Sequence, residues 1–436
     1  MATRKYWLET YGCQMNKAES EALALSLTEG GWIESESALA ADLVILNTCS
    51  VRETAEQRVW GRLGFYRRLK RSRPFTLVLT GCMAERLKER IPREFPEVNV
   101  VLGTLRKGEL LEALNNASVS RAPLVMTGGD RYEFSRIHST GGFRAFIPIM
   151  HGCNNNCSYC IVPRVRGPEV SREPGEILAE IHLLEQRGIR EITLLGQNVN
   201  SYSFPCNGSA ISFSELLRMV REELGAIRRV RFLTSHPRDF SDSIIDAISE
   251  SDVFCRHVHL PLQSGSDRIL DLMNRGYTTE QYSRLVQKIR EGINGVSITT
   301  DILIGFPSES EIDFQDTLRM METIRFDDAF TYYYNPREGT PAYVMADALP
   351  QKIKLEHLSR TIEIQRSITR ENARSRLGME IDVLVEDVSK KSPDELLART
   401  EWDSMAVLPG APHLLGQFVK VKLQSLLGNT YRAIHT

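Results

Sequence analysis

The chain has 436 residues, of which 42% are hydrophobic and 25% are charged, a composition typical of a soluble globular protein with about two or three domains. Its formal net charge of −2 excludes a uniformly basic coat for nucleic acid, so any RNA contact must come from local patches. No apolar run approaches the ~18 residues that a membrane helix needs, so we expect a cytoplasmic protein with no membrane contact. Thiols stay reduced in that compartment, which favours ligands or catalysts over disulfides for the eight cysteines.

The first 130 residues repeat one pattern three times: a short apolar run, a cysteine and a helical pattern. The predicted strands cover residues 5–10, 42–46 and 75–79. Apolar runs that alternate with helices predict a parallel sheet, whose right-handed crossovers bring every carboxyl end to one edge. Because one cysteine lies just beyond each end, we expect the three thiols to converge, each near a helix N-terminus that favours the thiolate. These residues are Cys13, Cys49 and Cys82.

Residues 116–141 are rich in polar residues and glycine, which indicates a linker. Six βα units follow, with predicted strands at residues 143–150, 191–196, 229–234, 257–262, 296–304 and 329–334. Six parallel units predict an open, partial version of the eight-fold α/β barrel, with its site at the carboxyl ends of the strands. After a helical stretch (350–376), alternating runs predict a small antiparallel β-barrel at the end of the chain. The predicted fold class is therefore α/β, with an N-terminal parallel α/β domain (1–118), a central partial (β/α)6 barrel (139–372) and a C-terminal β-barrel (373–436).

Cys153, Cys157 and Cys160 form a Cx3Cx2C motif in the loop after the first barrel strand. Three thiolates this close can bind three irons of one cubane and leave the fourth iron open. An open metal position indicates chemistry rather than a structural role. The alternative is a structural zinc site with His151 or a distant cysteine, which is disfavoured because no second CxxC pair follows.

With Tyr159 before its last cysteine, this motif resembles the signature of radical S-adenosylmethionine (SAM) enzymes. That resemblance implies that the open iron chelates SAM, and that one electron cleaves it to a 5′-deoxyadenosyl radical that removes hydrogen from carbon. The N-terminal cysteines and the C-terminal barrel extend the resemblance to the methylthiotransferases along nearly the whole chain. It implies two 4Fe-4S clusters, an auxiliary one on Cys13, Cys49 and Cys82, catalytic roles for all six cysteines, and a TRAM domain at the end. The alternative for the N-terminal trio is three structural cysteines that never meet.

Five further stretches resemble the bacterial branch that methylthiolates C2 of N6-dimethylallyladenosine next to the anticodon of tRNA. They cover residues 10–16, 233–237, 260–266, 274–278 and 334–340. The resemblance implies a tRNA anticodon stem-loop with a prenylated adenosine as partner, and a low-potential electron donor such as flavodoxin or ferredoxin; we expect a monomer. Two departures are the lack of a Gly-Arg-Thr plus Asn-Arg run in residues 398–405, and serines at 308 and 310. The alternatives are methylthiolation of threonylcarbamoyladenosine in tRNA or of a ribosomal protein, and a non-catalytic metal-bearing RNA-binding scaffold.

Polar residues at the ends of barrel strands are the expected contacts of SAM. We expect these contacts from Tyr159, Gln197, Ser235, Gln263, Arg275 and Asp301. For each one, an ordinary hydrogen-bonded turn or core residue is the alternative. The inward members of the aromatic run at 330–334 are candidates for the wall that contacts the adenine or its isoprenoid tail. Candidate RNA contacts are the basic run at 67–73 and, on the C-terminal barrel, Lys390, Lys391, Arg399, Lys420, Lys422 and Arg432.

Overall fold

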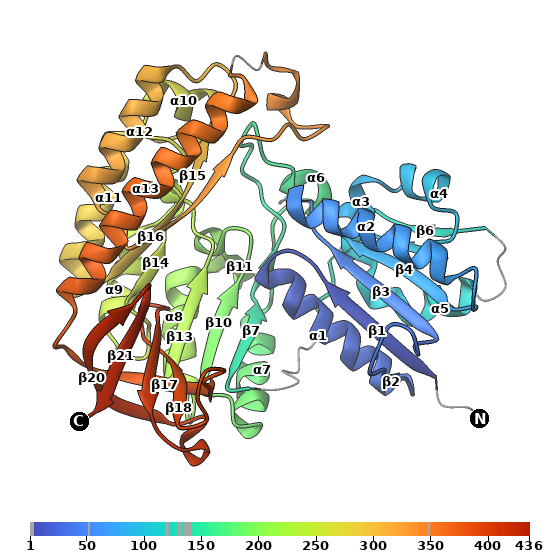
Figure 1. Ribbon diagram of the computed structural model, residues 1–436, viewed down its shortest axis with the longest axis horizontal. Coiled ribbons are helices and arrows are strands. Elements are labelled where there is room, and N and C mark those ends of the chain that lie inside the picture. The colour runs from blue at the N-terminus through green and yellow to red at the C-terminus, as the bar shows by residue number, and fades with distance from the viewer. Residues whose placement is uncertain (1–3, 51–52, 118–121, 130–131, 135–141, 347–348) are drawn as a thin grey trace.

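The computed structural model describes residues 4–50, 53–117, 122–129, 132–134, 142–346 and 349–436. Three sheet systems follow one another along the chain: an N-terminal parallel sheet, a central half-open barrel and a small closed barrel (Figure 1). Within these ranges, no helix is long and apolar enough to cross a bilayer. The expected boundaries at residues 118 and 139 lie outside the described residues.

The N-terminal sheet has six strands in the order β2-β1-β3-β4-β5-β6, and every pair of neighbours is parallel. Its strands are β1 (Lys5–Thr10), β2 (Ile33–Glu34), β3 (Leu43–Thr48), β4 (Thr76–Gly81), β5 (Val100–Leu102) and β6 (Leu124–Met126). Its helices are α1 (Gln14–Glu29), α2 (Glu53–Leu69), α3 (Cys82–Arg86), α4 (Arg90–Glu94) and α5 (Leu110–Ala117), with the 3-10 helix η1 (Thr104–Glu109) before α5. The central strand β3 is buried at every position, as expected of a parallel sheet covered on both faces.

Three strands of this sheet were not predicted, because two or three residues are too few to show a period. One of them, β6, lies inside the segment 116–141 that the composition indicated as a linker. That prediction is wrong for residues 124–126, which pair with β5 and form the edge strand of the sheet.

All six predicted strands of the central barrel are present, and all run parallel. They are β7 (Arg144–Pro148), β10 (Glu191–Leu195), β13 (Arg229–Leu233), β14 (His257–His259), β15 (Ser297–Ile304) and β16 (Asp328–Tyr333). The two three-stranded sheets meet where Val230 bridges Phe254. On the outside lie α7 (Pro174–Gln186), α8 (Phe213–Glu223), α9 (Asp242–Ser249), α10 (Asp267–Leu272), α11 (Thr279–Gly292), α12 (Glu311–Ile324) and α13 (Gln351–Ser375). The main apolar core fills the space between these strands and helices.

The inner face of this barrel is divided between two halves. Helix α1 packs against the first half, where Met15 and Ala18 contact Leu195. The second half carries Asp301 on β15 and, opposite it on β16, Phe330. Phe330 is 50% exposed, so this half of the barrel interior stays open while α1 fills the first.

The C-terminal barrel is closed in the order β17-β18-β19-β21-β20. Its strands are β17 (Glu380–Val388), β18 (Glu395–Arg399), β19 (Met405–Pro409), β20 (Phe418–Leu427) and β21 (Thr430–His435). The prediction of an antiparallel barrel is confirmed for four of the five strand pairs, whereas β19 and β21 run parallel. Closure leaves no strand edge exposed.

The segment that departs from the expected TRAM sequence attaches this barrel to the amino ends of the central strands. Arg231 of β13 donates hydrogen bonds to the carbonyls of Thr400 (2.6 Å) and Glu401 (2.7 Å), and Trp402 donates to the carbonyl of Gly295 (3.2 Å). Arg399, which was a candidate RNA contact, instead forms ion pairs with Glu386 and Asp403. Residues 399–402 therefore serve as a docking surface inside the molecule.

Candidate active site

The three N-terminal cysteines meet at one edge of the sheet, as the parallel topology predicted. Cys13 caps the start of α1 after β1, Cys49 follows β3, and Cys82 begins α3 directly after β4. The thiols of Cys13 and Cys49 are hydrogen-bonded to each other, and Cys82 interacts electrostatically with Cys13. Cys49 and Cys82 are buried, and Cys13 is partly buried.

Gly12 makes this convergence possible. It has a φ of +113°, and a Cβ at this position would lie 2.3 Å from the Cβ of Cys49 and 2.8 Å from its sulfur. The sequence Tyr-Gly-Cys therefore needs glycine because the turn before Cys13 passes directly against Cys49.

The acidities of these thiols differ. The hydrogen bond from Cys49, together with the nearby Arg166, lowers the pKa of Cys13 to about 6 against the opposing effect of burial. Burial raises the pKa of Cys82 above its usual value, although this residue begins a helix. The expectation that helix N-termini favour the thiolate at all three positions is thus wrong for Cys82, because a completely buried thiol loses its hydration.

The second cysteine trio lies on a loop that distant motifs hold in place. The side chain of Gln197 accepts a hydrogen bond from the Gly152 N–H (2.5 Å), which positions the residue before Cys153. The N–H of Ser158 donates to the carbonyl of Met273 (3.0 Å), and its carbonyl accepts from Ala342 (2.8 Å). The two residues that support the cysteine loop, Met273 and Ala342, thus lie close in sequence to the stretches at 274–278 and 334–340.

Arg275 reaches this trio from the 274–278 stretch. Its Nη1 lies 3.4 Å from the sulfur of Cys157 and 3.5 Å from the hydroxyl of Tyr159, while Nη2 donates to the carbonyl of Pro261 (3.0 Å). Burial raises the pKa of Cys153 to about 11 and, with the neighbouring Cys157, that of Cys160 to about 12. Without a metal these two thiols are therefore protonated at neutral pH, and metal binding must displace their protons.

The donor sets suit 4Fe-4S clusters and SAM. Among the described residues, no three His, Cys, Asp or Glu side chains are grouped closely enough to bind a single metal ion, whereas a cubane spreads its thiolates over three irons. Buried polar atoms without a hydrogen-bond partner occur at several places in these ranges, and five of them lie just beyond the carboxyl ends of β10 and β13. They are Asn198 Oδ1, both amide atoms of Asn200, Ser235 Oγ and His236 Nε2. Such atoms are rare in a core, and a polar ligand would satisfy them.

The six residues expected to contact SAM are not all equally placed or available to a ligand. Gln197, Ser235 and Gln263 follow the carboxyl ends of β10, β13 and β14, whereas Tyr159 and Arg275 lie at the cysteine loop and Asp301 lies within β15. Gln197 and Arg275 already bind the protein itself, at Gly152 and at the cysteine loop. Gln263 has a φ of +70° and donates its N–H to the carbonyl of Asp301 (2.8 Å), whose carboxylate lies 3.5 Å from His259. Ser235 keeps an unpartnered hydroxyl, and all six stay predictions as SAM contacts. The sequence analysis missed Asn198 and Asn200, which an Asn-x-Asn pattern after a barrel strand signals.

A buried cluster of charges joins the two cysteine trios and was not predicted. Arg166, the last residue of α6 (Val162–Arg166), donates to Glu19 Oε1 (2.7 Å) and to Asn16 Oδ1 (3.1 Å). Lys107 also pairs with Glu19, and Nη1 of Arg166 lies 3.3 Å from His151 Nδ1. Arg166, Glu19 and Lys107 are each at most 8% exposed. The ring of Tyr132 stacks on His151 at 3.6 Å, so the supposed linker also contributes to the site.

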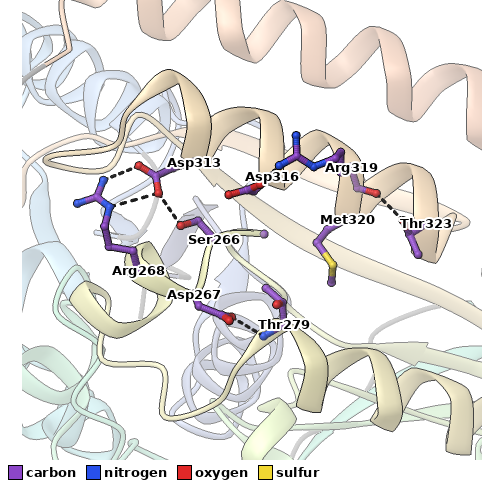
Figure 2. A pocket seen from close by; sticks show the side chains of 10 residues that line it. Ser266, Asp267, Arg268, Thr279, Asp313, Asp316, Arg319, Met320 and Thr323 are labelled. Carbon is purple, nitrogen blue, oxygen red and sulfur yellow. Dashed lines mark hydrogen bonds and ion pairs between the residues drawn. The ribbon is translucent and has the colours of Figure 1, made fainter.

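A separate hollow of about 510 Å³ lies among the outer helices α10, α11 and α12 (Figure 2). Its charged side chains already have partners: Asp313 pairs with Arg268, and Asp316 pairs with Arg319. Asp267 accepts a hydrogen bond from the backbone N–H of Thr279 (2.7 Å). With these charges satisfied, the hollow offers less to a ligand than the unpartnered atoms near the cysteines.

Family models match three successive parts of the chain. They are described as an uncharacterised protein family, UPF0004 (residues 5–103), the Radical SAM superfamily (147–321) and the TRAM domain (374–434). Among solved structures, the chain resembles the radical S-adenosylmethionine methyltransferase TsrM from Kitasatospora setae, solved with cobalamin and a 4Fe-4S cluster. The TM-score is 0.60 at 16% identity, covering 78% of this chain and 77% of that one. The cobalamin-dependent radical enzyme OxsB gives 0.52 at 10% identity, covering 84% of this chain and 56% of that one. At such identities these likenesses show the fold alone.

Curated relatives match almost from end to end. A tRNA-2-methylthio-N(6)-dimethylallyladenosine synthase of Treponema denticola is 46% identical over 98% of this chain and 99% of its own length. The enzyme of the same name from Moorella thermoacetica is 42% identical over 97% of this chain and 96% of its own length. The chain therefore belongs to the family of tRNA-2-methylthio-N(6)-dimethylallyladenosine synthases within the radical SAM enzymes.

Proposed function

We propose that this protein uses SAM to methylthiolate C2 of N6-dimethylallyladenosine next to the anticodon of tRNA. The observation that carries the proposal is the presence of two separate cysteine trios, each gathered at the carboxyl ends of parallel strands. We assign residues 1–118 to the domain of the first trio, 139–372 to the radical SAM core and 373–436 to the TRAM domain. A relative that is 46% identical over 98% of this chain carries this activity in its name.

Cys153, Cys157 and Cys160 would hold one 4Fe-4S cluster, and Cys13, Cys49 and Cys82 a second. When bound, the cluster on Cys153, Cys157 and Cys160 would supply the electron for cleavage of SAM, and the cluster on Cys13, Cys49 and Cys82 would provide the site for the sulfur chemistry. The protein positions and shields these groups. Arg275 directs a hydrogen-bond donor at the Cys157 sulfur, and Gln197 fixes the start of the loop.

The unpartnered polar atoms beyond β10 and β13 are the best candidates to bind SAM. Ser235 and Asn200 are buried, so a ligand that they bind is sheltered from water. We keep Tyr159, Gln263 and Asp301 as contacts on the other side of the same opening. The side chain of Asp301 is 27% exposed beside His259, so it remains accessible from the open half of the barrel.

The open half of the barrel suits the prenylated adenosine. Phe330 is half exposed on its inner face and offers an apolar wall for the isoprenoid tail. A base next to the anticodon must leave its stack to reach such a pocket, as bases do in other base-modifying enzymes.

The RNA backbone would contact the C-terminal barrel. Lys390, Lys391, Lys420 and Lys422 are exposed there, and phosphate contacts dominate the affinity for RNA. The run at 67–73 is a weaker candidate, because Arg67 pairs with Glu97 and Arg73 donates to the carbonyls of Ala38 and Ala41. We further propose a cytoplasmic monomer that receives electrons from a low-potential donor such as flavodoxin or ferredoxin.

Anaerobic turnover tests the proposal. The reconstituted protein is incubated with SAM, dithionite and an anticodon stem-loop that carries N6-dimethylallyladenosine, and the products are read by nucleoside mass spectrometry. We expect the triple Cys→Ala change at 153, 157 and 160 to abolish both 5′-deoxyadenosine and the methylthio product. The same change at 13, 49 and 82 is expected to abolish only the product. Modification of a threonylcarbamoyladenosine stem-loop instead would overturn the substrate assignment, and product from the second variant would overturn the role of the N-terminal trio.

A further inference from the structure

The buried charges between the two cysteine trios do not balance. Arg166 and Lys107 are cations, and within the described ranges both form their ion pair with the same carboxylate, that of Glu19. His151 adds no charge, because a guanidinium can only donate and the His151 nitrogen that faces Arg166 must therefore accept. One positive charge is left over in a site with almost no contact with water. An unpaired buried charge is costly, so the arrangement requires an anion nearby.

The nearest groups able to become that anion are the N-terminal cysteines. Asn16 Oδ1, which accepts from Arg166, also lies 3.7 Å from the sulfur of Cys13. Cys82 packs against Val165, the residue before Arg166, and its thiol interacts electrostatically with Arg166. The guanidinium thus lies near two of the three thiols that would hold the N-terminal cluster.

We propose that Arg166, assisted by Lys107, is the counter-charge of the 4Fe-4S cluster on Cys13, Cys49 and Cys82, and that it raises the potential at which this cluster accepts an electron. The inference rests on the proposed function, which places a cluster on these cysteines. Three thiolates outweigh the charge of the oxidised cubane, and reduction adds one more negative charge. A buried cation therefore stabilises the reduced form more than the oxidised form.

The origin of the partners adds a positioning role. Glu19 comes from α1 of the N-terminal sheet, whereas Arg166 ends α6, which begins two residues after Cys160. Their ion pair therefore fixes the N-terminal cysteines relative to the loop of the second trio. Arg166 is a positioning residue in this sense, because it acts through Glu19 and Asn16 rather than on the substrate.

The test uses the full chain with Cys153, Cys157 and Cys160 changed to Ala, so that a cluster can form only on the N-terminal trio. In this background the midpoint potential is measured by a redox titration followed by electron paramagnetic resonance, and iron is counted per chain. We expect Arg166→Gln and Lys107→Gln to lower the potential, because each removes a cation. Glu19→Gln is expected to raise it, because two cations are then unopposed. Arg166→Lys keeps the charge, and Arg164→Gln removes an exposed arginine of the same helix, so both are expected to match the parent.

The opposite signs separate electrostatics from loosened packing, which would expose the cluster to water in all the neutralised variants alike. Shifts of the same sign in Arg166→Gln and Glu19→Gln, or none in either, would overturn the inference. Where Arg166→Gln binds no iron, Lys107→Gln and Glu19→Gln must still move the potential in opposite directions. A parent chain that binds no iron at all overturns the cluster assignment itself, which is the failure of the proposed function rather than of the counter-charge.

Discussion

Replacing Gly12 with alanine tests whether the meeting of Cys13 and Cys49 depends on this one turn. The new Cβ would lie 2.3 Å from the Cβ of Cys49, well inside van der Waals contact, and the backbone φ of +113° is strained for any L-residue. The strain costs about 1–3 kcal/mol, and forcing extra volume into a packed site costs about 1–3 kcal/mol more. We therefore expect Gly12→Ala to lower the free energy of unfolding by about 2–6 kcal/mol.

Gly31 supplies the matched control. It also has a positive φ, +79°, but a Cβ there would have nothing within 4 Å, so Gly31→Ala carries only the backbone cost of about 1–2 kcal/mol. Three of the four tryptophans lie in the N-terminal part of the chain, at 7, 32 and 60. Urea unfolding followed by tryptophan fluorescence in a Trp402→Phe background therefore monitors this part alone.

Iron content provides the functional readout for the same pair of variants. After reconstitution we expect Gly12→Ala to hold about half of the wild-type iron, because one of two cubanes loses its site, and Gly31→Ala to hold all of it. Equal stability losses in the two variants, or full iron in Gly12→Ala, would refute the reasoning from the Cys49 contact.

Three further changes test other contacts of the site. Gln197→Leu leaves the Gly152 N–H without its acceptor and is expected to lower the free energy of unfolding by about 1–3 kcal/mol. In a chain whose N-terminal cysteines are changed to Ala, it is also expected to lower the iron content, because the loop of Cys153, Cys157 and Cys160 is then held less firmly. Arg231→Met removes one of the arginines that pair with the buried Glu191 and is expected to lower the free energy of unfolding by up to about 3–5 kcal/mol. Because it also removes the hydrogen bond to Thr400, it is expected to speed tryptic release of the C-terminal barrel. Burial of Glu9 would raise its pKa, but hydrogen bonds from Arg62 and three aromatic side chains more than offset this, so its pKa is lowered. Its contribution is then complete above the unfolded pKa of about 4.3 and is lost as the pH falls through the lower folded pKa. The urea midpoints of wild type and Glu9→Gln should therefore differ at pH 7 and converge as the solution is made more acidic.

The features predicted from sequence are those that local patterns determine. The long strands were found because runs such as residues 42–46 are apolar and end at a cysteine or a polar turn, and the parallel order of β1, β3 and β4 follows from the helices between them. The convergence of Cys13, Cys49 and Cys82 followed from that topology. The two-residue strand β2 shows no period, and β6 is surrounded by the polar residues of a segment that has the composition of a linker.

The buried charges were beyond the reach of such patterns. Glu19 lies 88 residues from Lys107 and 147 residues from Arg166, and each of the three would be exposed by default. Arg399 is a second example: its charge and position in the C-terminal barrel indicated a candidate RNA contact, and the structure pairs it with Glu386 of the neighbouring strand. In both cases the partner is determined by how separate parts of the chain dock, which no local period records.

The docking of α1 also explains why one half of the barrel can serve as the site. The inner face of β7, β10 and β13 is apolar near its carboxyl end, and Met15 and Ala18 cover it there. The same contact brings Cys13, at the start of α1, toward the barrel interior. Because α1 fills this half and Phe330 is half exposed in the other, the adenosine pocket that we propose lies on the side of β14–β16. A single helix therefore both brings Cys13 of the N-terminal trio to the barrel and leaves the side of β14–β16 for the proposed adenosine pocket.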